Sequence, residues 1–145
     1  MGKSSSKAKI KKVEMSENFA TDIVETTLKL EASPLNKSVR NNVAIISFDE
    51  PHKKVNTLNS KLLPIFEQFL NEIEKDEDIH AIVLTSAKKD CFIAGADISE
   101  LQATQNEEEA FKLSRGGQLL FQRLSQFPKP VVAAIAGSCL GGGLE

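Results

Sequence analysis

Apolar side chains gather in short runs that predict four β-strands. Residues 43–48 and 81–85 are rich in β-branched side chains, which favour strands. The run at 81–85 shows no polar alternation, which is typical of a strand covered on both faces of its sheet. Residues 131–136 form the longest apolar run and predict another buried strand, and the alternating residues 27–32 predict a short strand near the start.

The segments between these runs have helical spacing. Residues 62–73 carry apolar side chains three or four positions apart, with Pro64 in the first turn and Asn59 or Ser60 available as a cap. A short helix is predicted to begin at Ser99, and a longer one covers residues about 107–126. The apolar face of the longer helix consists of Ala110, Leu113, Gly117, Leu120, Phe121 and Leu124.

Strands that alternate with helices predict an α/β architecture built from βα units. Turns are expected at residues 33–34 and 41–42, and a loop over 86–98. Residues 1–26 are polar and aperiodic and predict a mobile tail, so the domain is expected to occupy residues 27–145. The Gly-rich turn 141–143 predicts a strand-to-helix junction, and we expect its helix to continue beyond residue 145.

The charge distribution argues against a nucleic-acid partner, because the net charge is only −2. The first twelve residues hold five lysines and no acid, so the tail is basic and the body of the chain is acidic. No apolar run approaches the ~18 residues that span a bilayer, so we expect a soluble protein. Residues 1–6 match a loose N-myristoylation pattern that would allow membrane association, but we favour a solvated basic tail.

The two cysteines, Cys91 and Cys139, lie in separate Gly- or Ala-rich segments and form no spaced ligand set. We expect two free thiols in a reducing intracellular compartment. No metal site is expected, because only His52 and His80 could join the cysteines as ligands. The start of the chain also lacks the apolar stretch of a signal peptide and the arginines of a transit peptide.

Two Gly- or Ala-rich loops after predicted strands carry the candidate chemistry. In the first, Gly141, Gly142 and Gly143 allow positive φ and a close approach of backbone N–H groups to a ligand. N–H groups at a helix start have no partner within the helix and can stabilise an oxyanion, on which Glu145 could act as acid or base. A plain tight turn with a surface glutamate explains the same residues.

The second loop is residues 94–98, AGADI. Its small residues again permit close backbone approach, and Asp97 can cap the following helix, which is by itself a sufficient structural explanation. One N–H group from each loop would form a two-donor oxyanion hole. Composition does not determine whether the two loops meet in space.

Two segments, CFIAGADI (91–98) and KPVVAAIAGSCLGGGLE (129–145), resemble the signature regions of the crotonase, or enoyl-CoA hydratase/isomerase, family. They occur in the family's order and at predicted strand–loop–helix junctions. A third segment, KVNTLN (54–59), is similar to the hydratase domain that opens the α subunit of the multifunctional (trifunctional) fatty-acid β-oxidation enzymes. The resemblance covers residues 27–145 and implies a partial crotonase (ClpP/crotonase-like) spiral of βα units, truncated at its C-terminal side.

By motif position, the resemblance implies an oxyanion hole made by the N–H groups of Ala96 and Gly142, with Glu145 as a catalytic acid–base. It also implies a set of substrate-binding residues around them. These are Lys54, Val55 and Asn56 near the acyl-CoA entrance, Ala94, Gly95, Asp97 and Ile98 along the CoA, and Gly141.

The implied reaction is the hydration of trans-2-enoyl-CoA to 3-hydroxyacyl-CoA in fatty-acid β-oxidation, through a thioester enolate. Family hydratases share the added water between two glutamates. The second lies beyond residue 145, so we expect little activity from this chain alone. The step needs no cofactor, because CoA is part of the substrate, and NAD would serve only a downstream dehydrogenase domain.

Two other functions stay open. A Δ3–Δ2 enoyl-CoA isomerase shares the fold and shuttles a proton with one glutamate, and a truncated, non-catalytic product could bind acyl-CoA or a partner. The resemblance further implies a homo-oligomer, or a β-oxidation complex with a thiolase subunit. It places the protein in the mitochondrial matrix, or in the cytoplasm if the protein is bacterial.

Overall fold

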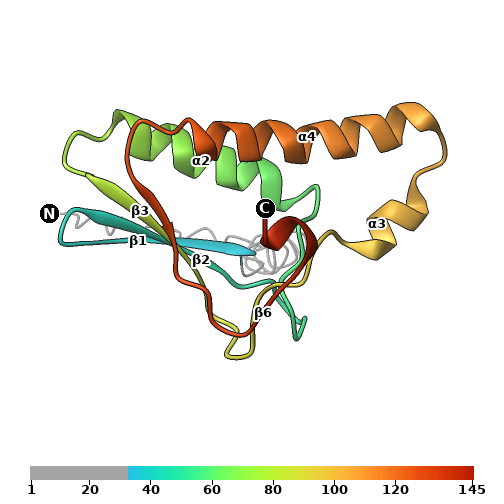
Figure 1. Ribbon diagram of the computed structural model, residues 1–145, viewed down its shortest axis with the longest axis horizontal. Helices are drawn as coiled ribbons and strands as arrows, with labels where there is room; N and C mark the ends of the chain where they lie inside the picture. Colours follow the sequence, from blue (N-terminus) through green and yellow to red (C-terminus); the bar gives the residue numbers. More distant parts are fainter. Residues whose placement is uncertain (1–32) are drawn as a thin grey trace, which may run out of the picture. The chain divides into compact units, whose positions relative to one another are not determined.

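Figure 1 shows a computed structural model of the chain, in which residues 33–145 are described. The predicted tail at 1–26, with its myristoylation pattern, and the predicted strand at 27–32 lie outside the described residues. The described residues belong to one unit of the chain, Ala32–Glu145. No helix within residues 33–145 combines the length and the apolar character needed to cross a bilayer.

The main sheet has four strands in the order β1–β2–β3–β5. Strands β2 (Val43–Phe48), β3 (Ala81–Ser86) and β5 (Val131–Ala133) are parallel, and β1 (Leu35–Arg40) pairs with β2 in the antiparallel sense. The predicted strands at 43–48 and 81–85 are confirmed. The strand predicted over 131–136 ends early, because after Ala134 the chain leaves β3 and turns toward a second, smaller sheet.

Strand β1 was not predicted, because five of its six residues are exposed or half-buried and it carries no apolar alternation. Its place is set by the expected turn at Asn41 and Asn42, whose φ angles are 50° and 64°. Two central residues with positive φ are what a tight β-hairpin turn requires, and asparagine tolerates that conformation. The turn therefore folds β1 back along β2.

Helices α2 (Leu62–Lys75) and α4 (Glu107–Ser125) lie along one side of the main sheet (Figure 1). The core fills the space between α2 and the sheet, and Phe48 packs edge-on against Phe66 with 5.7 Å between ring centroids. The opposite face of β3 is half-buried in the described part of the chain, so burial on both faces is not observed there. The buried apolar side chains of α2, β2 and β3 are Leu62, Phe66, Leu70, Ile73, Ala44, Ile46, Phe48, Ile82 and Leu84.

Helix α2 begins as the sequence predicts. The Asn59 side-chain oxygen accepts hydrogen bonds from the N–H groups of Lys61 and Leu62 at 3.2 and 3.0 Å, so Asn59 supplies the capping contact. Ser60, the other predicted cap, instead donates its hydroxyl to Glu100 at 2.7 Å. Because these bonds satisfy N–H groups that have no partner inside the helix, they fix the segment that enters α2.

Helix α4 touches the core only near its C-terminal end, where Leu120 is buried and Leu124 packs against the core cluster. Arg123 ties it to α2 through Asn71 at 2.7 Å and Glu74 at 3.0 Å. The N-terminal half of the predicted apolar face is not covered by the core, which leaves it free to line a cavity.

A second sheet of two short parallel strands, β4 (Cys91–Ile93) and β6 (Ser138–Cys139), lies beside the first. The sequence predicted only a loop over 86–98, because a three-residue strand is too short to show a periodicity. Strand β4 leads toward the short helix α3 (Ile98–Ala103), and β6 leads into a 3-10 turn, η1 (Gly141–Gly143). Both cysteines are free thiols, as predicted.

Gly137, between β5 and β6, offers a test of how closely the segments that precede β4 and β6 approach each other. Its φ is 76°, and a Cβ there would lie 2.1 Å from the Asp90 carbonyl carbon. We expect Gly137→Ala to lower the free energy of unfolding in urea by at least about 2 kcal/mol, since strained backbone alone costs of order 1–3 kcal/mol.

The matched control is Gly117→Ala in α4, where an added Cβ meets no atom within 4 Å. This change should leave stability unaltered or raise it by about 0.5–1 kcal/mol, the gain expected for alanine over glycine in a helix. Equal stability of the Gly137 variant and the unsubstituted chain would contradict the observed contact between Gly137 and Asp90.

Candidate functional site

The pairing of β4 with β6 brings the two predicted loops together. Cys91 pairs with Ser138, and the Leu140 N–H donates to the Ile93 carbonyl at 3.0 Å. The carboxyl ends of parallel strands lie at the same edge of a sheet, so the segments that follow them are neighbours. A Cβ added to Gly141 would lie 3.5 Å from the Gly95 Cα, which shows how closely the two backbones approach.

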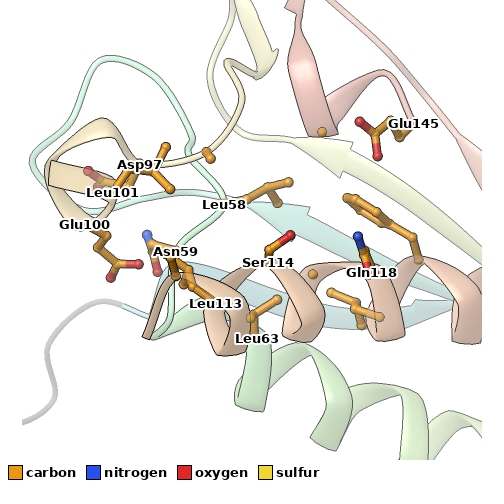
Figure 2. Close-up of a pocket in the computed structure, with 16 residues that line it drawn as sticks. Leu58, Asn59, Leu63, Asp97, Glu100, Leu101, Leu113, Ser114, Gln118 and Glu145 are labelled. Atoms are coloured by element: carbon orange, nitrogen blue, oxygen red, sulfur yellow. The ribbon is translucent and has the colours of Figure 1, made fainter. Parts of the chain in front are cut away.

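A cavity of about 370 Å³ lies between these loops and helix α4 (Figure 2). Figure 2 shows Ser114 and Gln118 on α4, across the cavity from Glu145. Most of the wall is apolar or small. The apolar and small lining residues are Leu58, Leu63, Leu101, Leu113, Leu120, Phe121, Ala96, Ala110, Gly117 and Gly142. The pattern of a helical face on α4 predicted several of them, although that pattern by itself is equally typical of core packing.

Ala96 lines the cavity, and its N–H donates no hydrogen bond within residues 33–145. The Gly95 carbonyl accepts a hydrogen bond from Leu58 N–H at 2.8 Å, and Asp97 N–H donates to the Leu58 carbonyl at 2.9 Å. In a trans peptide the C=O of one residue and the N–H of the next point in opposite directions. The Gly95–Ala96 peptide is trans, so the Ala96 N–H points away from Leu58, and it has no acceptor within residues 33–145.

The Gly142 N–H is free for a similar reason. The Gly141 carbonyl accepts a hydrogen bond from Leu144 N–H at 2.9 Å inside the 3-10 turn. The N–H of the same peptide group therefore points out of the start of that turn. In the described part of the chain it too has no acceptor. Gly142 lies close against its surroundings, since an added Cβ would be 2.8 Å from a Leu58 methyl group.

Glu145 is exposed and lines the same cavity. The other two cavity-lining carboxylates are engaged elsewhere. Glu100 accepts hydrogen bonds from Ser60 N–H and hydroxyl at 2.8 and 2.7 Å, and Asp97 is bound by Lys53 and Ser99. Among residues 33–145, Glu145 is thus the cavity carboxylate that is available to a ligand.

Asp97 caps α3, as its sequence position predicts, through a 2.9 Å hydrogen bond from Ser99 N–H and a second from the Ser99 hydroxyl. Its other oxygen lies 2.6 Å from Lys53 Nζ, which is also 2.7 Å from Glu50. The hydrogen bond from Lys53, and then those from Ser99, hold the pKa of Asp97 well below its usual range, although burial opposes this. The same contacts with Asp97 and Glu50 raise the pKa of Lys53 above its ordinary value.

Asn56 is buried, and its side chain is fully used in holding the strand ends together. Its Oδ1 accepts from Glu50 N–H at 2.8 Å. Its Nδ2 donates to the Phe48 carbonyl at 3.2 Å, the Ser86 hydroxyl at 2.9 Å and the Phe92 carbonyl at 3.0 Å. Asn56 therefore supports the loop that ends at Leu58 without lining the cavity.

The remaining implied substrate-binding residues do not form the wall of the cavity. Lys54, Val55 and Ile98 are exposed. Ala94 donates its N–H to the Asn56 carbonyl at 2.9 Å, and Gly95 and Gly141 form the close contact between the loops. Ala96, Gly142, Glu145 and Asp97 are the implied site residues that the fold brings to the cavity. The sequence did not predict that Glu50 bonds Lys53 and Thr57 next to this site, because its only signal was its position at the end of a strand.

Comparison with known proteins gives a family match over residues 38–145, described as Enoyl-CoA hydratase/isomerase. The fatty acid oxidation complex subunit alpha of Shewanella halifaxensis is 48% identical over 103 residues, which cover 71% of this chain. The corresponding subunit of Shewanella oneidensis is also 48% identical over 103 residues. The chain spans 14% and 15% of the lengths of these two curated relatives.

Solved structures give the same fold. An enoyl-CoA hydratase from Bacillus anthracis has a TM-score of 0.69 and 31% identity, covering 76% of this chain and 42% of that protein. An enoyl-CoA hydratase from Thermoplasma volcanium has a TM-score of 0.72 and 29% identity, covering 80% and 45%. These similarities confirm the predicted α/β, crotonase-like fold class.

The Asp97 contacts predict a pH dependence of stability. Because the pKa of Asp97 is lowered by folding, its contribution is present above the unfolded value of about 3.9 and is lost as the pH falls below it. We expect the free energy of unfolding to decline in this acid range, as measured by urea titration at several pH values.

Two variants separate the contribution of the Asp97–Lys53 ion pair from that of the helix cap. Asp97→Asn keeps a good helix cap but removes the ion pair, so it should weaken the acid dependence at a cost of about 0–1 kcal/mol, since Lys53 is partly exposed. Asp97→Ala should cost about 1 kcal/mol more through loss of the cap. An acid dependence that is unchanged in Asp97→Asn would assign it to other groups.

Proposed function

Because this chain belongs to the enoyl-CoA hydratase/isomerase family, we propose that its cavity binds an acyl-CoA thioester and serves the hydration of trans-2-enoyl-CoA in fatty-acid β-oxidation. The observation that carries the proposal is that Ala96 and Gly142, whose N–H groups have no acceptor within residues 33–145, line the same cavity as Glu145. Two N–H donors and a carboxylate are the groups that enolate chemistry requires.

In the proposed reaction, the oxygen of water bonds to C3 of the enoyl chain, and the electrons of the C2–C3 double bond move toward the thioester oxygen. The N–H groups of Ala96 and Gly142 stabilise the negative charge on that oxygen. Glu145 accepts a proton from the attacking water and returns it to C2 as the enolate electrons move back to that carbon, which completes the 3-hydroxyacyl-CoA. The donors act strongly because they are fixed in place before charge develops.

Family hydratases use a second glutamate for the shared water. Within residues 33–145, the cavity offers Glu145 alone for this role. Measurements of thioester binding and of proton removal at C2 therefore test the proposal on this chain more directly than measurements of hydration. The apolar wall of the cavity would contact the acyl chain, and the transfer of that chain from water to an apolar surface favours binding.

The proposed step adds water across a double bond, so it calls for no redox cofactor or metal, and CoA is part of the substrate. NAD would serve only a dehydrogenase domain elsewhere in the protein. Assembly with a thiolase subunit or as a homo-oligomer is a further proposal, supported by relatives that are named as α subunits of a complex. The two relatives described above are bacterial and lend no support to a mitochondrial location, so we propose only a reducing compartment that suits two free thiols.

A Δ3–Δ2 enoyl-CoA isomerase is the second candidate. Its supporting observation is that one available carboxylate, Glu145, lines the cavity, and a single acid–base can carry a proton between C4 and C2. Supplying both trans-2-enoyl and cis-3-enoyl thioesters separates the two activities. Turnover of the 3-enoyl substrate alone would favour the isomerase.

Glu145→Gln tests the acid–base role. We expect the variant to bind a saturated acyl-CoA with unchanged affinity in calorimetry. The rate at which hydrogen at C2 exchanges with deuterated water should fall by about 10²–10⁴-fold, the usual loss for a general acid–base. The exchange is followed by NMR of the thioester.

The control is Glu108→Gln, the same change on the outer face of α4, where Glu108 pairs with Lys112. It should alter neither binding nor exchange. Binding without exchange in the unsubstituted chain would favour the non-catalytic, acyl-CoA-binding alternative, and undiminished exchange in Glu145→Gln would remove Glu145 from the mechanism.

Gly117→Leu tests the location of the acyl chain. Gly117 lines the cavity and has open space where a side chain would begin, so leucine should project into that space. We expect affinity for long-chain acyl-CoA to fall by about tenfold or more, the effect of one or more misplaced methylene groups, while short-chain acyl-CoA is little affected. Equal losses for both chain lengths in calorimetry would contradict this placement.

A further inference from the structure

The orientation of the Ala96 donor depends on the main chain of Leu58. Leu58 clamps the second loop on both sides of Ala96, through its N–H to the Gly95 carbonyl at 2.8 Å and its carbonyl to the Asp97 N–H at 2.9 Å. Rotation of the Gly95–Ala96 peptide would break the first of these bonds. The direction of the Ala96 N–H is therefore fixed only as firmly as Leu58 itself is held.

Glu50 holds the residues on both sides of Leu58. Its Oε2 accepts hydrogen bonds from Thr57 N–H at 3.0 Å and Thr57 Oγ1 at 2.7 Å. Its Oε1 accepts one from Asn59 Nδ2 at 3.0 Å and lies 2.7 Å from Lys53 Nζ. Glu50 is buried, with 8% of the residue exposed, and both of its carboxylate oxygens are used by donors from residues 53–59.

The same ammonium group links Glu50 to the second loop directly. Lys53 Nζ is 2.6 Å from Asp97 Oδ2, and Asp97 follows Ala96 in the chain. Leu58 also reaches the other proposed donor, because its side chain lies where a Cβ on Gly142 would approach to 2.8 Å. Leu58 is therefore close to both donor residues, and Glu50 bonds its two neighbours in the chain, Thr57 and Asn59.

We propose that Glu50 is a positioning residue for the oxyanion donors, acting through Thr57 and Asn59 on Leu58 and through Lys53 on Asp97. The inference rests on the proposed function, since it assigns Glu50 a role in the same site. Glu50 does not line the cavity and touches no substrate in this arrangement. Its effect should appear in the polarisation of the thioester carbonyl and not in the affinity for the acyl chain.

Glu50→Gln is the informative variant, because glutamine has nearly the same shape but only one acceptor oxygen. Its NH₂ group would face donors at Thr57 or at Lys53 and Asn59, so one side of the clamp is lost. The probe is trans-2-butenoyl-CoA labelled with ¹³C at the thioester carbonyl. Infrared difference spectra of the bound thioester measure the carbonyl stretch, which moves to lower frequency as hydrogen bonds to the oxygen strengthen.

In the unsubstituted chain we expect a clear downshift of the bound carbonyl stretch relative to the free thioester. In Glu50→Gln the downshift should become smaller while the dissociation constant, from calorimetry, changes little. A purely structural role would give another result, a lower melting temperature or weaker binding with the full downshift retained in the bound fraction. That result, or spectra identical to those of the unsubstituted chain, would overturn the inference.

Two further variants complete the experiment. Glu72→Gln is the matched control. It makes the same change at a residue of α2 whose carboxylate pairs with Lys37 of β1, and it should preserve the downshift. Thr57→Val removes the hydroxyl that donates to Glu50 but keeps the Thr57 N–H donor. If Glu50→Gln does not fold, Thr57→Val is measured in its place, with the same expected and contradicting results. Absence of any downshift in the unsubstituted chain would instead overturn the proposed oxyanion hole.

Discussion

The close approach of Gly95 to Gly141 is the constraint on which the cavity depends. These two residues belong to loops that are 46 positions apart in the printed sequence and follow different strands. Both have positive φ, 112° and 51°, a conformation that side chains other than glycine's disfavour. An added Cβ would make only ordinary contacts, 3.6 Å from the Leu140 carbonyl oxygen at Gly95 and 3.5 Å from the Gly95 Cα at Gly141, so the backbone conformation is what calls for glycine. The contact between the two loops places the neighbouring residues, Ala96 and Gly142, in the wall of one cavity.

Support for that contact is polar. Two buried residues beneath the loops, Glu50 and Asn56, bond the ends of strands β2, β3 and β4 and the segment that carries Leu58. Burying polar groups is costly unless each finds a partner, and no buried side-chain N or O atom in residues 33–145 lacks one. A network of this kind defines directions more narrowly than apolar packing, because hydrogen bonds weaken steeply with angle. The apolar core holds the sheet to α2, whereas the polar network positions the loops.

The elements that sequence reasoning found are those with a strong local signal. Strands β2 and β3 and helix α2 bury a regular set of side chains, so their periodicity is visible along the chain. The apolar face of α4 is equally periodic, although it mostly lines the cavity and buries only Leu120 among the described residues. The cap at Asp97 follows from a side chain that bonds two residues ahead. Strands β4 and β6 have no such signal, because they are short and pair with partners distant in the sequence. Strand β1 pairs with the adjacent β2, but it carries no apolar alternation that would mark it as a strand. The contacts of Glu50 were not predicted either, because an acidic residue at the end of a strand is usually exposed to solvent, whereas Glu50 is buried.

By itself, the sequence determined the α/β class, the main helices, the two glycine loops and the resemblance to a family with a thioester-binding site. These follow from local composition, side-chain period and motif order. Only the tertiary structure decided that the loops meet and that Asn56 bonds the strand ends next to them. It also decided that the Ala96 and Gly142 N–H groups have no acceptor within residues 33–145. The physical reason is that the direction of a peptide N–H is set by the partner of the carbonyl in the same peptide. For Ala96 that partner is Leu58, which only folding brings beside Gly95.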